Sequence, residues 1–204
     1  MRDARWRCMN KQVDPTGEGA TRHSTFVLDI EAIRARARSH IEHGAVTDSY
    51  RADRGTVIRV LNEVLATELV CMLRYKRHAI TAPKLGGIAG EAVATELGTH
   101  ASEEQEHADR IAARIVELGG EPDYDPKNLA SRSHSEYVAG SSLKQMLQED
   151  LVAERIAIGT YAEVIRYLGD DDPTTRRMME DILSKEEEHA DELSDWLERL
   201  TTRV

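Results

Sequence analysis

Two short segments of the sequence repeat the same pairing of a carboxylate with an imidazole. Residues 104–109 read Glu-Gln-Glu-His-Ala-Asp, and residues 186–191 read Glu-Glu-Glu-His-Ala-Asp. In each copy a glutamate precedes the histidine by three positions, which places both side chains on one face of an α-helix, about one turn apart. Two such helices facing each other would bring together four potential metal ligands: Glu104, His107, Glu186 and His189.

The elements expected to position these residues are four long helices. Their approximate ranges are 53–80, 90–118, 142–168 and 174–200. Links rich in Gly, Pro and Asp join the first helix to the second and the third to the fourth, so each pair is expected to form an antiparallel hairpin. About twenty residues separate the pairs, which suits a crossover running the length of a bundle. The sequence therefore predicts an all-α four-helix bundle.

Each predicted helix carries a stripe of apolar residues that is interrupted by ionisable ones. In the first helix the interruption is Glu68, followed seven residues later by Tyr75, and in the third it is Glu154, followed by Tyr161. Unpaired carboxylates are costly to bury, so a core holding several of them needs cations. The sequence therefore predicts a site for two metal ions, with the ligands Glu68, Glu104, His107, Glu154, Glu186 and His189.

Carboxylate and imidazole ligands together favour iron or manganese, and zinc is a substitute that cannot change valence. Glu103 also lies on the inner face, but the second copy has Lys185 at the matching place, so Glu104 is preferred. Tyr75 is either a redox-active neighbour of the metals, a donor to a ligating carboxylate, or a core aromatic. His100 lies one turn away, as a hydrogen-bonded core histidine, an outer metal site or a gate.

Composition and charge narrow the class of protein. The 204 residues suffice for one domain, a bundle over 51–204, preceded by an arm over 1–50 with a short helix at about 29–43. Apolar runs are too short to cross a membrane, and the first residues lack a secretory pattern. The two cysteines form no Cys-x-x-Cys pair, which favours reduced thiols and a cytoplasmic protein. The net charge of −10 disfavours nucleic acid as a partner.

Over about residues 53–200 the chain resembles the ferritin-like superfamily, and most closely the bacterioferritins and related ferritin/Dps-type proteins. The segments that carry the resemblance are Ala66-Thr-Glu68-Leu-Val with Tyr75, Glu104-x-x-His107-Ala-Asp-Arg, Asp150-Leu-Val-Ala-Glu154 and Glu186-x-x-His189. The resemblance implies that Glu104 and Glu186 bridge two iron ions per subunit. It also implies that Glu68 and Glu154 are terminal ligands and that each histidine binds one ion.

The activity implied by this resemblance is that of a ferroxidase. Such a protein binds two Fe(II), oxidises them with oxygen or peroxide, and stores Fe(III) in a homo-oligomer, either a dimer or a cage. Catalytic residues would be the six ligands together with Tyr75. Bacterioferritins carry a haem-binding methionine where this chain has Gln105, so haem is not predicted. The alternatives are a substrate-oxidising dimetal-carboxylate oxidase and a non-catalytic metal-binding bundle.

Overall fold

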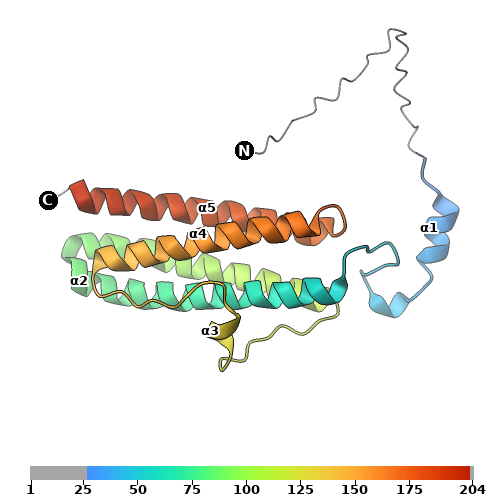
Figure 1. The fold of residues 1–204 in the computed structure, drawn as a ribbon, viewed down its shortest axis with the longest axis horizontal. Helices are drawn as coiled ribbons and strands as arrows, with labels where there is room; N and C mark the ends of the chain where they lie inside the picture. The colour runs from blue at the N-terminus through green and yellow to red at the C-terminus, as the bar shows by residue number, and fades with distance from the viewer. Residues whose placement is uncertain (1–26, 203–204) are drawn as a thin grey trace, which may run out of the picture.

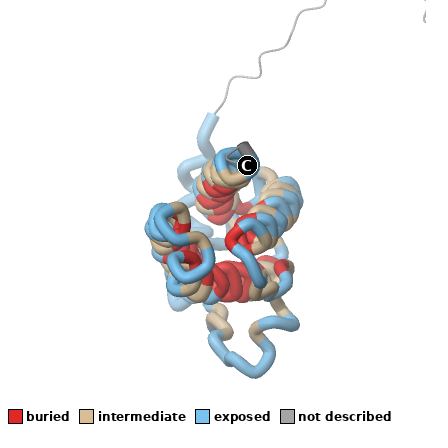
Figure 2. The backbone as a smooth tube through the Cα atoms, turned by 90° about the vertical axis from the view of Figure 1, so that its left-hand side faces the viewer, coloured by how far each residue is buried: buried red, intermediate tan, exposed pale blue. Residues whose placement is uncertain are grey.

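The computed structural model describes residues 27–202, and within them four helical rods lie side by side (Figure 1). Helix α2 (Arg54–Glu117) forms two of the rods, and α4 (Leu143–Leu168) and α5 (Pro173–Thr202) form the others. Seen end on, the buried residues of all four rods face a common interior (Figure 2). The predicted all-α bundle of two antiparallel hairpins is confirmed. None of the helices within residues 27–202 combines the length and apolarity needed to cross a bilayer.

The first hairpin turns at Gly87, inside the span of α2. Its backbone has φ 54° and ψ −133°, a conformation that glycine adopts far more readily than other residues. Two limbs of α2, residues 54–86 and 88–117, therefore lie antiparallel. The prediction ended the first helix near Ile80, but helical structure continues past Pro83. Pro83 lacks the N–H that would bond the carbonyl of Ala79, and the helix continues for only one more turn before the chain reverses at Gly87.

The helix predicted over residues 29–43 is wrong in length. The α1 helix spans only Ile30–Arg36, and the short 3-10 helix η1 (Ile41–His43) follows it. His40 between them has a left-handed backbone with φ 49°, which a continuous α-helix cannot contain. No residue of α1 is buried, so the helix lacks the packing that stabilises longer amphipathic helices. Residues 1–26 of the predicted arm over 1–50 lie outside the described residues, and the division at residue 50 stays a prediction.

The crossover between the hairpins, residues 118–142, includes the short helix α3 (Leu129–Arg132), which the sequence pattern did not predict. Polar side chains on the first limb of α2 hold this segment by its backbone. Asn62 bonds the carbonyl of Glu121, the hydroxyl of Thr67 accepts from the amide of His134, and Arg74 donates to the carbonyl of Glu136; these distances are 3.2, 2.9 and 3.0 Å. The crossover is therefore fastened along the length of the bundle.

A buried network of charged side chains joins α2 to α4. Arg74 Nε lies 2.8 Å from Asp150 Oδ1, and His78 Nδ1 lies 2.8 Å from Asp150 Oδ2. All three side chains are fully buried, and His78 Nε2 also lies 2.9 Å from the carbonyl of Ala139 in the crossover. Because each charge has partners, this network is tolerated in the core.

Candidate metal centre

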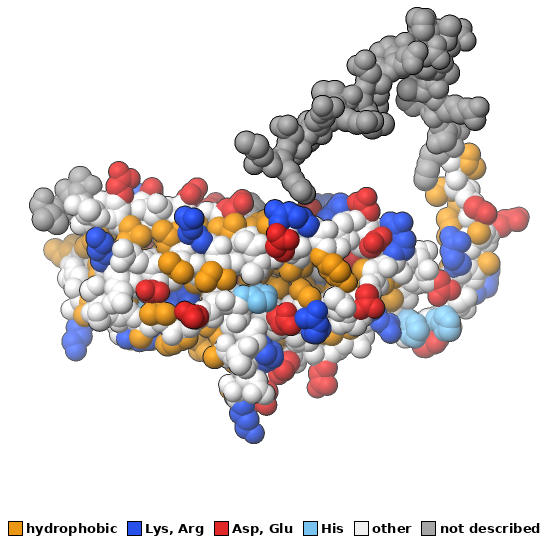
Figure 3. Space-filling model, viewed as in Figure 1, with side chains coloured by type: hydrophobic (Ala, Val, Ile, Leu, Met, Phe, Trp, Pro, Cys, Tyr) orange, Lys and Arg blue, Asp and Glu red, His pale blue; other side chains and the backbone are white. Residues whose placement is uncertain are grey.

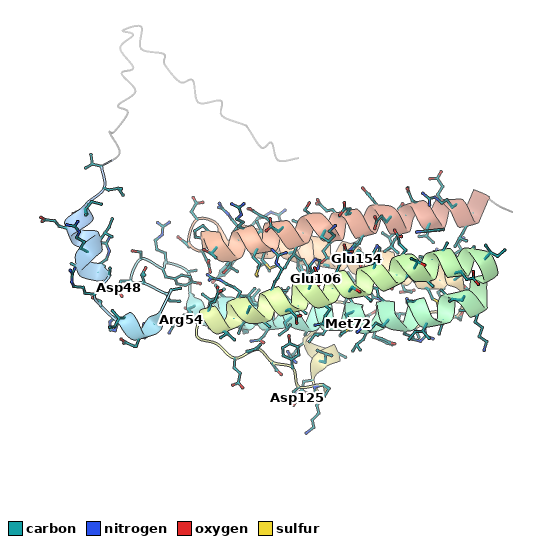
Figure 4. All side chains as sticks on the ribbon, turned by 180° about the vertical axis from the view of Figure 1, so that it is seen from behind. Asp48, Arg54, Met72, Glu106, Asp125 and Glu154 are labelled. Carbon is teal, nitrogen blue, oxygen red and sulfur yellow. The ribbon has the colours of Figure 1, made fainter. Side chains whose placement is uncertain are left out.

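The six residues singled out by the sequence lie together in the interior of the bundle. Glu68 is on the first limb of α2, Glu104 and His107 are on the second, Glu154 is on α4, and Glu186 and His189 are on α5. Each is at most 4% exposed. Glu154 lies near the middle of the bundle's length (Figure 4). Each rod contributes its candidate ligands from the same face that carries its buried apolar residues.

The ligand atoms fall into two overlapping groups. The first contains Glu68 and His107, the second contains Glu154 and His189, and both contain Glu104 and Glu186. Within each group one atom from every residue lies within 4.8 Å of the others. Glu104 and Glu186 are common to both groups, so each of these carboxylates lies within reach of both positions.

Hydrogen bonding leaves part of every one of these six side chains unsatisfied. His107 Nδ1 lies 3.0 Å from Glu186 Oε1, and His189 Nδ1 lies 3.5 Å from Glu104 Oε1, yet none of these four atoms has a hydrogen-bond partner. Buried polar atoms without partners are rare and costly. In these six residues the unpartnered atoms are Glu68 Oε2, Glu104 Oε1, His107 Nδ1, Glu154 Oε2, both carboxylate oxygens of Glu186, and His189 Nδ1. Oxygen and imidazole donors in this arrangement fit two divalent cations.

Two tyrosines bond the carboxylates of Glu68 and Glu154, each reaching across to the opposite hairpin. The hydroxyl of Tyr75, on α2, donates to Glu154 Oε1 on α4. The hydroxyl of Tyr161, on α4, donates to Glu68 Oε1 on α2. Both tyrosines are buried. Each bond satisfies one oxygen of a carboxylate and leaves the other oxygen facing the cluster, so the tyrosines orient the two carboxylates.

Burial and mutual repulsion alter the acid–base behaviour of the cluster. Burial raises the pKa of Glu104 and Glu154 well above the ordinary value, and the neighbouring Glu186 adds to both shifts. Burial also disfavours ionised Glu68, but its close contacts with Glu104, His107 and Tyr161 keep the pKa of Glu68 below its ordinary value. For His107, burial opposes the charged form, but the nearby carboxylates of Glu186 and Glu68 prevail and raise its pKa to about 10. Without metal, protons held by Glu104, Glu154 and His107 therefore reduce the net negative charge of the cluster.

Further charged side chains lie next to the six candidate ligands. Glu103 Oε2 lies 2.8 Å from His189 Nε2, so Glu103 orients the imidazole from behind, as partners of metal-bound histidines commonly do. Glu106, which lies next to His107 in the sequence, is exposed. His100 Nε2 lies 2.8 Å from Glu192 Oε2. Glu192 could not be identified from the sequence, because its contact with His100 crosses from one helix to another.

Known proteins resemble this chain over most of the bundle. Residues 58–202 match the family model for the ferritin-like domain. A bacterioferritin of Mycobacterium avium is 31% identical over 147 residues, which cover 70% of this chain and 84% of that protein. The DNA protection during starvation protein of Pyrococcus furiosus is 31% identical over 131 residues, covering 63% of this chain and 69% of that one.

Solved structures show the same arrangement of helices. The dodecameric thioferritin of Bacteroides fragilis, described as related to bacterioferritin, superposes with a TM-score of 0.71 at 31% identity, covering 75% of this chain and 90% of that chain. The bacterioferritin of Desulfovibrio desulfuricans, described with a diiron site, gives a TM-score of 0.64 at 25% identity, covering 73% and 82%. The chain belongs to the ferritin-like family.

Proposed function

We propose that this protein is a ferroxidase and iron-storage protein that binds two Fe(II) ions per subunit and oxidises them. Glu104 and Glu186 would bridge the two ions. Glu68 with His107 would complete one position, and Glu154 with His189 the other. Manganese or zinc could occupy the same positions, but zinc would not undergo oxidation.

The observation that carries this proposal is the set of unpartnered donor atoms. Six buried side chains, from all four rods, each leave at least one oxygen or nitrogen without a hydrogen bond, and these atoms converge on two positions. A structural ion-pair network would satisfy its members, as the group around Asp150 does. Convergent donors with no partner are instead what a cation requires.

Relatives support iron as the substrate. The bacterioferritin of Desulfovibrio desulfuricans has a diiron site described in different catalytic states, and several other matching proteins are bacterioferritins. Two Fe(II) ions would release two electrons on becoming Fe(III). One O2 with two protons would accept them as hydrogen peroxide, or one hydrogen peroxide with two protons would yield two waters.

The protein's part in this reaction is electrostatic and positional. Four carboxylates in a buried site stabilise Fe(III) more than Fe(II), because attraction between charges grows with the charge of the ion and with the removal of water. The bond from Tyr75 to Glu154 and the bond from Tyr161 to Glu68 fix two of these carboxylates before iron arrives. Tyr75 is proposed to position Glu154.

Anaerobic titration with Fe(II) tests the proposal. Binding should saturate at two ions per chain, and exposure to air should then oxidise them, with the iron retained through gel filtration in the absence of any organic substrate. Replacing both bridging carboxylates, Glu104→Gln and Glu186→Gln, should abolish paired binding, because each position loses two of its donors.

The matched control is Glu106→Gln combined with Glu187→Gln. Both are exposed glutamates on the same two helices, so the control removes the same charge without touching the cluster. It should bind two ions like the unmodified chain. Unchanged Fe(II) binding in the bridging variant would refute the dimetal site. Oxidation that requires an organic substrate would instead indicate an oxidase.

We also infer that the chain forms a homo-oligomer. The related protein of Bacteroides fragilis is a dodecamer. Large apolar side chains on the outside of the bundle would be covered by a second copy, and several lie on the face shown in Figure 3, along α4 and α2. In the helices of the bundle, the most exposed of these side chains are Ile88, Ile80, Val116 and Val152. The native mass in solution, divided by the chain mass, gives the number of copies.

A further inference from the structure

A third group of metal-ligating side chains lies beside the six. It consists of Glu96 and His100 on the second limb of α2 and Glu192 on α5, and we call it the outer triad. One ligand atom of each residue lies within 4.8 Å of the others. None of the three is needed for the two positions described above.

The imidazole of His100 is not fully satisfied by the protein. Its side chain is 1% exposed, and its Nε2 lies 2.8 Å from Glu192 Oε2. Its Nδ1 is buried and has no hydrogen-bond partner. In any protonation state, one nitrogen of this ring is therefore left without a protein partner, which is unfavourable for a buried polar atom.

The two carboxylates of the outer triad also lack full compensation. Glu96 forms no hydrogen bond or ion pair within the part of the chain that the structure describes, and it lies close to a second carboxylate, Glu192. Two negative charges at this separation repel one another. A cation between them would remove the repulsion and would offer a ligand position to the imidazole.

The outer triad connects the surface with the inner cluster. Glu192 has a side chain that is 45% exposed and Glu96 is half-buried, whereas every residue of the two inner groups is buried. The ring of His100 stacks on the ring of His189, with centroids 4.1 Å apart. The three groups of ligands therefore run from solvent to the interior, with the outer triad at the solvent end.

We infer that the outer triad binds a third divalent cation, held more weakly than the inner pair, and passes metal to the inner positions. Two carboxylates and one imidazole suit Zn(II), Mn(II) or Fe(II), and water would fill the remaining coordination positions. The binding step depends only on the outer triad. The transfer step rests on the function proposed for the inner cluster.

Zinc binding to the metal-free full-length chain tests the binding step. Zn(II) is redox-inactive, so equilibrium dialysis followed by elemental analysis counts ions without oxidation. The unmodified chain should bind three ions, and Glu96→Gln combined with Glu192→Gln should bind two. A control with the same change in charge, Glu91→Gln combined with Glu187→Gln, alters exposed residues of the same helices and should bind three.

The inner variant, Glu104→Gln with Glu186→Gln, separates this proposal from the proposed function. One ion retained by the inner variant and lost when Glu96→Gln and Glu192→Gln are added would establish the third site even if the inner pair proved not to bind iron. Two ions per chain in both the unmodified protein and the Glu96/Glu192 variant would overturn the third site and leave the inner pair intact. No bound zinc in the unmodified protein would overturn the third site, whereas the inner pair is judged separately by the Fe(II) titration described above.

Uptake kinetics test the transfer step. Stopped-flow absorbance with Co(II) should show the inner positions filling about tenfold more slowly in the Glu96/Glu192 variant, because a negatively charged entry raises the local concentration of cations. The final occupancy of the inner positions should be the same in both proteins. Equal filling rates would show that the outer triad lies off the route.

Discussion

At the scale of single residues, the centre depends on side chains that are held in place before metal binds. The carboxylates of Glu68 and Glu154 each accept a hydrogen bond from a tyrosine of the opposite hairpin. Tyr75 donates to Glu154, and Tyr161 donates to Glu68. The histidine on α5 is held from behind by Glu103. These contacts restrict the rotamers of the proposed ligands, so less conformational freedom is lost when an ion binds.

Removing either tyrosine hydroxyl should destabilise the metal-free protein. Tyr161→Phe leaves a buried oxygen of Glu68 without its donor, and Tyr75→Phe does the same to Glu154, at a cost of about 1–3 kcal/mol in the free energy of unfolding. Urea unfolding in the presence of a chelator measures this cost. Bound Mn(II) should reduce it, because the ion contacts the carboxylates directly.

The control for these variants is Tyr167→Phe, since Tyr167 is 51% exposed. It should change the free energy of unfolding by less than about 0.5 kcal/mol. Buried variants that unfold like Tyr167→Phe would show that the two hydroxyls contribute nothing to the stability of the cluster.

The sequence predicted the inner cluster residue by residue because each ligand interrupts an apolar stripe at helical spacing. Glu104 could be distinguished from Glu103 only because two copies of the motif could be compared. Glu96 and Glu192 could not be predicted as partners of His100. Their proximity depends on how two helices are rotated about their axes, and helical periodicity alone does not determine that rotation.

At the scale of helices and turns, the first hairpin depends on close approach of the backbone. The limbs of α2 meet at Gly90, where an added Cβ would lie 2.2 Å from the carbonyl oxygen of Ala82. A backbone atom cannot move aside as a flexible side chain could. The tight turn at Gly87 is therefore possible only with a glycine facing Ala82.

Gly90→Ala should destabilise the protein by about 1–3 kcal/mol or more, because the limbs must separate to accommodate the methyl group. Gly98→Ala on the same limb is the matched control. Nothing lies within 4 Å of a Cβ added there, so alanine should stabilise the helix by about 0.5–1 kcal/mol. Urea unfolding of both variants measures the difference, and equal effects would contradict the close-approach argument.

Helix ends and packing faces show why the sequence located these elements only approximately. It predicted a break around Pro83 but ended the helix six residues too early, since only the conformation of Gly87 actually ends the first limb. On α4 the large side chains of Leu151 and Ile158 are half-buried, whereas the small Ala157 is buried. Small residues admit neighbouring helices closely, so α4 turns a smaller face inward than hydrophobicity suggests.

At the scale of the whole molecule, metal-free stability should fall as the pH rises. The raised pKa values of Glu104, Glu154 and Glu186 mean that the folded protein keeps protons that the unfolded chain releases above its ordinary value of 4.5. The stabilisation is complete below that value and is lost as the pH rises through the folded pKa values. The imidazole of His107, with its pKa raised to about 10, acts in the same direction above its ordinary value of 6.5.

Urea unfolding at about pH 5.5 and about pH 8.5, with chelator and then with Mn(II), should show opposite trends. Without metal the free energy of unfolding should be lower at the higher pH. With metal the stabilisation should grow with pH, because cations and protons compete for the same carboxylates. Metal-free stability that rises with pH would mean that the cluster is not protonated in the folded state.

The tyrosine of each hairpin donates a hydrogen bond to the other hairpin, and this reciprocity bears on the origin of the chain. Each hairpin contributes to the cluster one glutamate, one tyrosine and one Glu-x-x-His segment, and the tyrosine of each hairpin bonds the glutamate of the other. Two identical hairpins related by a twofold axis would form the same contacts without any crossover. A single ancestral gene for one hairpin could thus have served as a symmetric dimer, and its duplication and fusion would have required only the connecting segment.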